Sequence, residues 1–127
     1  MKRVVTLTGI ILVLVILTTT VVASIMWVNT NQCLFRFYFT GSTGSIDVDI
    51  STKSHPCDID ITVKLYRKIV FIWVKDDEWN DSVYGDELSF SESFTGTVGT
   101  KYKVVLEATV TDNGVTDTIS RELESEC

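Results

Sequence analysis

The stretch covering residues 96–114 constrains the fold more than any other part of this sequence. Across residues 102–110 every second residue is apolar, and the alternate residues are mostly polar. A period of two is the pattern of a β-strand with one face on a core and the other in water. Asn113-Gly114 follows, and Asn-Gly between two strand-like runs favours a type I′ hairpin turn, which needs φ > 0 at both central residues. The sequence therefore predicts a hairpin whose second strand covers residues 115–121.

Short strand-like runs, separated by turn residues, make up the rest of the chain after its N-terminus. The predicted strands cover residues 34–39, 46–50, 59–65, 69–74, 88–94, 102–111 and 115–121. The run 69–74 is apolar on both faces, which indicates either a covering loop or a patch for a partner. Residues 76–86 are acidic and rich in turn formers, so we interpret them as a connection. Seven strands and no window of helical period predict an all-β fold, a seven-stranded antiparallel immunoglobulin-like sandwich.

The N-terminus carries the pattern of an export signal. Lys2 and Arg3 precede an uncharged stretch, residues 4–28, that begins with a dense run of Val, Ile and Leu. A basic start, an apolar core and a small-residue exit predict a signal peptide over residues 1–23, cleaved after Ala23. The alternative is an uncleaved anchor ending at residue 28, because that length can span the ~30 Å of hydrocarbon in a bilayer.

Either outcome at the N-terminus exports the rest of the chain. We expect residues 24–32 to form a short linker and residues 33–127 to form the β-sandwich domain. The predicted location is secreted and extracellular. If the N-terminal segment is retained, the location is the cell membrane, with a single N-terminal span and the domain outside.

The charge of the exported part argues against some classes of partner. Without Lys2 and Arg3 the formal net charge changes from −6 to −8. Nucleic acid and anionic lipid surfaces both require basic patches, so this balance disfavours them. We expect no nucleic-acid partner, and contact with a membrane only through residues 4–28 if they are not cleaved.

The last third of the chain is similar to the corresponding part of a fibronectin type III domain. There, a Gly-Thr-x-Tyr sequence opens the sixth strand, an alternating apolar run with Ala follows, and an Asn-Gly-type turn leads to the last strand. The matching residues are Gly99, Thr100, Tyr102, Ala108, Asn113 and Gly114. The resemblance implies a fibronectin III-like sandwich in which Tyr102 is a corner residue whose hydroxyl returns to nearby backbone.

The whole chain also resembles small, uncharacterised secreted proteins of Gram-positive bacteria. In these, a signal peptide precedes one short β-domain with a Leu-x-(Arg/Lys)-Lys…Trp run and a Gly-x-x-Tyr strand. The matching residues are Leu65, Tyr66, Arg67, Lys68, Trp73, Trp79 and Tyr102. This resemblance implies a bacterial exported protein and no particular activity.

Three cysteines in an exported domain predict a disulfide. Cys33 immediately precedes the first predicted strand and Cys57 the third, and in a sandwich of alternating strand directions these strands start at the same end. Cys127 follows the seventh strand at the opposite end, about 20 Å away for a six-residue strand and beyond the reach of a disulfide. We predict a Cys33–Cys57 disulfide. Cys127 is then a free thiol or the link of a disulfide-bonded dimer.

Little in the sequence points to catalytic or metal-binding chemistry. His55 is the single histidine, so a two-histidine metal site is excluded, and its place before Pro56 favours a loop residue. No Gly-rich phosphate loop, CxxC pair or nucleophile elbow occurs. We therefore expect no cofactor, no catalytic residue and no dedicated metal site. The weak calcium candidates are Asp76, Asp77, Glu78 and Asp81.

Aromatic residues between the third and fifth predicted strands are the remaining functional signal. On the surface of a β-sandwich, aromatic side chains stack on sugars or anchor protein partners. The candidate interface consists of Tyr66, Ile72, Trp73, Trp79 and Tyr84. The alternative is that Trp73 belongs to the core and Trp79 covers a sheet edge.

These observations predict an exported, non-catalytic binding or interaction module whose partner is an extracellular protein or glycan. One alternative is a small carbohydrate-binding unit or enzyme that uses the acidic and aromatic region 73–86. Another is a membrane-anchored accessory protein that keeps residues 4–28.

Overall fold

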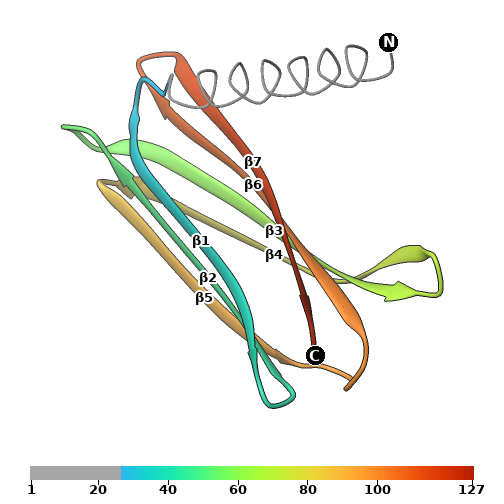
Figure 1. Ribbon diagram of the computed structural model, residues 1–127. Coiled ribbons are helices and arrows are strands. Elements are labelled where there is room, and N and C mark those ends of the chain that lie inside the picture. The colour runs from blue at the N-terminus through green and yellow to red at the C-terminus, as the bar shows by residue number, and fades with distance from the viewer. Residues whose placement is uncertain (1–26) are drawn as a thin grey trace, which may run out of the picture.

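A computed structural model describes residues 27–127, so the predicted signal peptide and most of the alternative anchor lie outside the described residues. Seven β-strands follow one another along this part of the chain (Figure 1). They are β1 (Thr30–Thr40), β2 (Thr43–Thr52), β3 (Cys57–Ile69), β4 (Ile72–Gly85), β5 (Glu87–Thr95), β6 (Lys101–Asp112) and β7 (Val115–Glu126). Within residues 27–127, no helix is long and apolar enough to cross a membrane.

The strands form two antiparallel sheets packed face to face, which confirms the predicted seven-stranded all-β sandwich. One sheet has the order β1-β2-β5, and the other has the order β4-β3-β6-β7. Every pairing between neighbouring strands is antiparallel. The two sheets also meet at one flank, where β1 of the first contacts β7 of the second.

The core lies between the sheets and is built from alternate residues of the central strands. Burial alternates strictly along β2, through the first nine residues of β3 and along most of β6. The inward-facing apolar residues of these strands are Ile46, Val48, Ile50, Ile59, Ile61, Val63, Leu65, Val104, Leu106, Ala108 and Val110. The period of two in the sequence therefore reflects the two environments of each strand, with one face buried in the core and the other exposed to water.

Tyr102 closes one end of this core. Its ring packs against Phe39 and Phe94 with centroid separations of 5.5 Å and 5.4 Å. Its hydroxyl accepts a hydrogen bond of 2.8 Å from the backbone N–H of Thr97, five residues upstream. This return of the hydroxyl to the preceding backbone is the arrangement of a tyrosine corner.

The hairpin predicted from Asn113-Gly114 is present and joins β6 to β7. Asp112 pairs with Val115, which leaves two turn residues with φ values of 50° at Asn113 and 75° at Gly114. Both central residues have positive φ, as a type I′ turn requires. This part of the prediction is confirmed.

The structure corrects the prediction for residues 69–86. Instead of a strand at 69–74 followed by an acidic loop, β3 runs on to Ile69, turns through two residues, and returns as the 14-residue β4. β4 is an edge strand, so polar residues on both of its faces stay in water while its backbone pairs with β3. A register shift opposite Leu65/Tyr66 leaves Asp76 as an extra residue and breaks the alternation that sequence analysis relies on.

The predicted Cys33–Cys57 disulfide is not present: Cys33, Cys57 and Cys127 are all free thiols. β1 begins at Thr30, earlier than predicted, so Cys33 lies inside the strand and not at its start. Cys57 is the first residue of β3 in the other sheet. The two residues also have different neighbours: the Cys33 carbonyl faces Arg121, whereas the Cys57 thiol faces His55.

Leu106→Ala tests the account of the core. Leu106 is completely buried at the centre of β6, so we expect its truncation to lower the free energy of unfolding by about 2–5 kcal/mol. Urea unfolding followed by tryptophan fluorescence measures this loss. Val98→Ala is the control, because Val98 is 80% exposed and its truncation is expected to change stability by less than about 0.5 kcal/mol. Equal losses in the two variants would contradict the assignment of the core.

Candidate functional site

The β3–β4 hairpin extends beyond the other strands of its sheet (Figure 1). β3 pairs with β6 only as far as Arg67, which faces Tyr102. Its pairing with β4 continues further, to Ile69 opposite Ile72. Residues 68–73 therefore form a two-stranded projection.

The end of this projection, which we call the hairpin tip (residues 69–72), is apolar and faces water. Val70, Phe71 and Ile72 are 77%, 88% and 67% exposed. Val70 and Phe71 are the two turn residues, because Ile69 pairs directly with Ile72. The hairpin tip thus presents apolar side chains to water beyond the last residue pair of β3 and β6.

The turn at the hairpin tip uses a residue that is poorly suited to its backbone. Val70 has a φ of 58°, and a positive φ costs an L-residue roughly 1–2 kcal/mol, with β-branched residues disfavoured further. Glycine or asparagine is the usual choice at such a position. The β6–β7 turn of the same protein has Asn113-Gly114 there. The side chain of Val70 therefore carries a cost in the folded domain without burying itself in that domain.

Behind the tip, an aromatic and basic cluster occupies the outer face of the sheet. Trp73 lies under two ammonium groups, with Lys103 Nζ at 4.6 Å and Lys68 Nζ at 5.6 Å from its ring centroid. Lys103 Nζ is also 5.4 Å from the ring centroid of Tyr66. We call these four residues the neck. Cation–π contacts of this kind hold the lysine side chains beside the rings.

Basic residues are concentrated in the strands at this end of the molecule, although the protein as a whole is acidic. Six of the nine Lys and Arg residues after residue 26 belong to β3, β4 and the start of β6. They are Lys64, Arg67, Lys68, Lys75, Lys101 and Lys103. Two of them are in ion pairs, Arg67 with Asp76 at 3.5 Å and Lys75 with Glu78 at 3.0 Å. The lysines of the neck instead contact aromatic rings.

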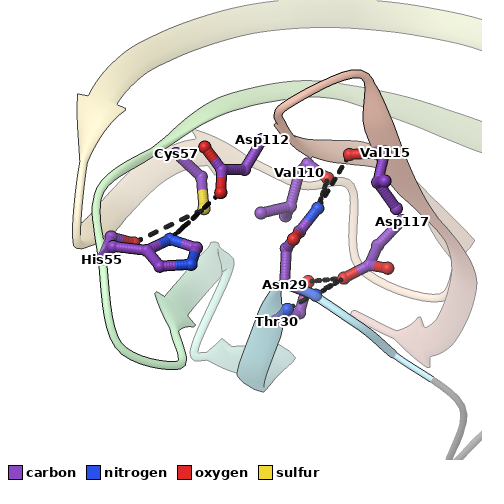
Figure 2. A network of polar contacts seen from close by, with 8 residues as sticks. All are labelled: Asn29, Thr30, His55, Cys57, Val110, Asp112, Val115 and Asp117. Atoms are coloured by element: carbon purple, nitrogen blue, oxygen red, sulfur yellow. Dashed lines mark hydrogen bonds and ion pairs between the residues drawn. The ribbon is translucent and has the colours of Figure 1, made fainter.

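At the opposite end of the sandwich, Asp117 binds the segment through which the chain enters β1 (Figure 2). Its carboxylate accepts hydrogen bonds from the backbone N–H groups of Val28, Asn29 and Thr30 at 2.9, 2.7 and 2.8 Å. The Thr30 hydroxyl donates a fourth at 2.9 Å. The side-chain amide of Asn29 in turn donates to the Val110 and Val115 carbonyls. We call this network the N-terminal clasp.

The N-terminal clasp explains how a carboxylate is tolerated in the core. Burial alone would raise the pKa of Asp117, but the hydrogen bonds from Val28, Asn29 and Thr30 outweigh it and hold the pKa below its usual value. The charged form is therefore the stable one. Because these bonds join β7 to the start of β1, the clasp links the two sheets.

Next to the clasp, three metal-ligating side chains converge on one point (Figure 2). His55 Nδ1 is 3.3 Å from Asp112 Oδ2 and 3.9 Å from Cys57 Sγ. The ligand atoms of the three residues all lie within 4.8 Å of one another, and within residues 27–127 this is the one such group of metal-ligating residues. We call it the Cys57 cluster.

The three side chains of the Cys57 cluster differ in their exposure to solvent. Cys57 is completely buried, whereas the side chains of Asp112 and His55 are 25% and 54% exposed. Burial raises the pKa of the Cys57 thiol, and the nearby carboxylates of Asp112, Asp117 and Asp86 raise it further. The thiol therefore stays protonated unless a cation joins it. His55 offers the same nitrogen to both partners, so the three residues do not form the relay of a catalytic triad.

The structure divides the predicted interface residues into separate places. Tyr66, Ile72 and Trp73 lie together at the neck and the hairpin tip. Trp79 points inward, with its ring centroid 6.4 Å from that of Phe90, and packs against the core. Tyr84 is 69% exposed, but it lies near the other end of β4, opposite Asp58.

The predicted calcium candidates do not converge on a site. Asp76 is paired with Arg67, and Glu78 is paired with Lys75. Asp77 and Asp81 each accept a hydrogen bond from the backbone N–H of the following residue. Along β4 these side chains alternate between the two faces.

Cys127 lies at the end of the sandwich opposite Cys57, as the topological argument predicts. Its backbone N–H donates to the Thr100 carbonyl at 3.0 Å. The side chain is half-buried in the described chain. A link between two chains through Cys127 stays a prediction.

Comparisons with known proteins find only distant structural likeness and no family. No family model matches the chain, and no curated protein matches it. Among solved structures, a β-glucuronidase of Parabacteroides merdae is similar over 74% of this chain, with 16% identity and a TM-score of 0.46. The chain spans only 13% of that enzyme's length. A protein from Archaeoglobus fulgidus is similar over 77% of this chain and 97% of its own, with 15% identity and a TM-score of 0.40.

Asp117→Asn tests the N-terminal clasp. The substitution keeps the size of the side chain but turns one acceptor into a donor that faces backbone N–H groups. We expect the free energy of unfolding at pH 7 to fall by about 2–4 kcal/mol. Because folding lowers the pKa of Asp117, its stabilising effect is complete above the unfolded pKa and disappears as the pH falls through the folded pKa. Wild-type stability is expected to decline as the pH drops through and below 3.8.

Urea unfolding at a series of pH values measures both effects, with Glu107→Gln as the control. Glu107 is an exposed acidic residue on the outer face of β6, so its substitution is expected to change stability by less than about 0.5 kcal/mol. The Asp117→Asn variant is expected to lose less stability on acidification than the wild type. If the free energy of unfolding of Asp117→Asn and of the wild type depended on pH in the same way, the role given to Asp117 would be refuted.

Proposed function

We propose that this chain is an exported, non-catalytic binding module whose hairpin tip docks into the surface of a membrane that contains anionic lipid. The observation that carries the proposal is the projection of Val70, Phe71 and Ile72 into water beyond the last strand pairing of β3 with β6. The strand grouping and the Tyr102 hydroxyl contact support the further proposal that the module is fibronectin III-like.

The order of residues along the hairpin matches the layers of a bilayer surface. Apolar residues at the tip suit the acyl region. Trp73 and Tyr66 follow, and aromatic rings of this kind prefer the boundary between acyl chains and headgroups. Lys68 and Lys103 lie at the same level as the rings, where their ammonium groups would reach headgroup phosphates while their stems stay in apolar surroundings.

Membrane binding requires both the apolar side chains of the hairpin tip and the lysines of the neck. Burying a Val, Ile or Phe side chain completely stabilises by about 1.5–3 kcal/mol each, and a shallow insertion yields only part of that. Each lysine near an anionic surface adds roughly 1 kcal/mol. The total is enough for reversible binding of a single domain, and neither part suffices alone.

This proposal departs from the sequence-based expectation that the acidic balance disfavours anionic lipid and that only residues 4–28 contact a membrane. Residues 68–73 contain no Asp or Glu, and exposed charges more than about 10 Å apart are largely screened at moderate salt. A net charge averages over the whole surface, whereas a membrane meets only the projecting end. The hairpin tip also lies at the opposite end of β3 from the segment through which the chain enters the sandwich. Docking therefore suits a released protein, or one anchored in a facing membrane.

Phe71→Ser tests the proposal by co-sedimentation with vesicles made of equal parts phosphatidylcholine and phosphatidylglycerol. Phe71 makes no contribution to the core, so we expect the variant to fold with unchanged stability and to bind these vesicles roughly tenfold more weakly. Vesicles of phosphatidylcholine alone are expected to bind the wild type more weakly than the mixed vesicles.

Val115→Ser is the matched control, because Val115 is an exposed hairpin residue at the other end of the molecule. It is expected to bind like the wild type. Failure of the wild type to sediment with the mixed vesicles would overturn the membrane assignment. In that case loss of a pulled-down extracellular protein in Phe71→Ser would identify the hairpin tip as a protein-binding surface.

A further inference from the structure

We infer that His55, Cys57 and Asp112 form a binding site for a zinc ion, with a fourth coordination position open to solvent. This site lies at the end of the sandwich opposite the hairpin tip and is independent of the proposed membrane docking. It runs against the sequence-based expectation of no metal site, which rested on the presence of only one histidine. One histidine is enough when a thiol and a carboxylate complete the set.

The spacing of the three ligand atoms fits tetrahedral zinc. Zinc–ligand lengths of about 2.3 Å to sulfur and about 2.0–2.2 Å to nitrogen and oxygen place the ligand atoms about 3.6 Å apart for sulfur and nitrogen and about 3.3 Å apart for nitrogen and oxygen. The observed separations are 3.9 Å between Cys57 Sγ and His55 Nδ1, and 3.3 Å between His55 Nδ1 and Asp112 Oδ2. The third pair, Cys57 Sγ and the Asp112 carboxylate, lies within 4.8 Å, so a bound ion requires a contraction of about 1 Å at most along that edge.

Two of the three ligands are held by regular structure. Cys57 opens β3 and Asp112 closes β6, and the adjoining pair Asp58–Thr111 keeps these two strand ends side by side. His55 comes from the loop just before β3. It is the exposed member of the set and the one that can adjust on binding. Two ligands fixed by strands and one exposed ligand from a loop give both a preformed site and a route for the ion.

The charge around Cys57 favours a divalent cation. Four carboxylates, those of Asp58, Asp86, Asp112 and Asp117, act on the thiol. Binding would replace the thiol proton with the metal: the proton leaves to solvent, a sulfur–metal bond forms, and no oxidation or reduction takes place. The combination of thiolate, imidazole and carboxylate suits zinc better than calcium or magnesium, which prefer oxygen ligands alone.

The alternative explanation is a simple His55–Asp112 ion pair beside a packed thiol. Cobalt(II) separates the two explanations, because it replaces zinc in such sites and absorbs light through its bond to a thiolate. Titration of the chelator-treated protein with Co²⁺ is expected to produce a thiolate-to-cobalt charge-transfer band and the strong visible bands of tetrahedral cobalt. Zn²⁺ is expected to displace the cobalt and abolish both.

His55→Gln is the decisive variant, because its exposed side chain can be changed without disturbing the core. Loss of an outer-shell partner weakens a metal site by about 10–100-fold, so loss of a direct ligand is expected to weaken Co²⁺ binding at least about a hundredfold. Cys57→Ser is expected to remove the charge-transfer band. Cys33→Ser and Cys127→Ser are the matched controls and are expected to keep both the band and the affinity.

The inference is overturned if the wild type gives no charge-transfer band. It is also overturned if His55→Gln binds Co²⁺ as tightly as the wild type, or if the band disappears in a control cysteine variant instead. Because Cys57 is buried, circular dichroism of the Cys57→Ser variant is recorded alongside. If that variant unfolds, the result from His55→Gln decides.

Discussion

The register between β3 and β6 is the constraint on which the rest of the structure depends. Ten consecutive residues of β3, from Asp58 to Arg67, pair with β6 and present four buried side chains to the core. Moving this pairing by one residue would turn every inward side chain of one strand toward water. With several side chains at about 1.5–3 kcal/mol each, only one register is compatible with a stable domain of this size.

The same register sets what happens at both ends of the sandwich. At one end, β6 begins at Lys101 while β3 runs on, which leaves the hairpin tip without a third strand and exposes its apolar side chains. At the other end, the first residue of β3 and the last residue of β6 are neighbours, which brings Cys57 beside Asp112. The two proposed binding regions are therefore consequences of a single alignment, separated by the full length of β3.

The sequence predicted the strands correctly where one face of a strand is buried and the other is exposed to solvent. The period of two in residues 102–110 and the turn residues Asn113-Gly114 were enough to predict β6, its hairpin and the sandwich class. It failed for residues 69–86, because an edge strand with a bulge shows no alternation, and the apolar run at 69–74 proved to be a turn and its flanks. The Cys57 cluster was missed for a different reason: its members are far apart in sequence, and only the β3–β6 pairing brings Asp112 to the start of β3. The predicted disulfide failed because the first strand begins before Cys33.

Measurement of the β3–β6 register by NMR tests the account most directly. Nuclear Overhauser effects between backbone protons of paired strands report which residues face each other, and amide exchange reports where pairing ends. The account predicts cross-strand contacts for Asp58 with Thr111 and Arg67 with Tyr102, and faster amide exchange from Lys68 through the hairpin tip than in the paired part of β3. Contacts shifted by one or more residues, or a hairpin tip protected as strongly as the centre of β3, would contradict it.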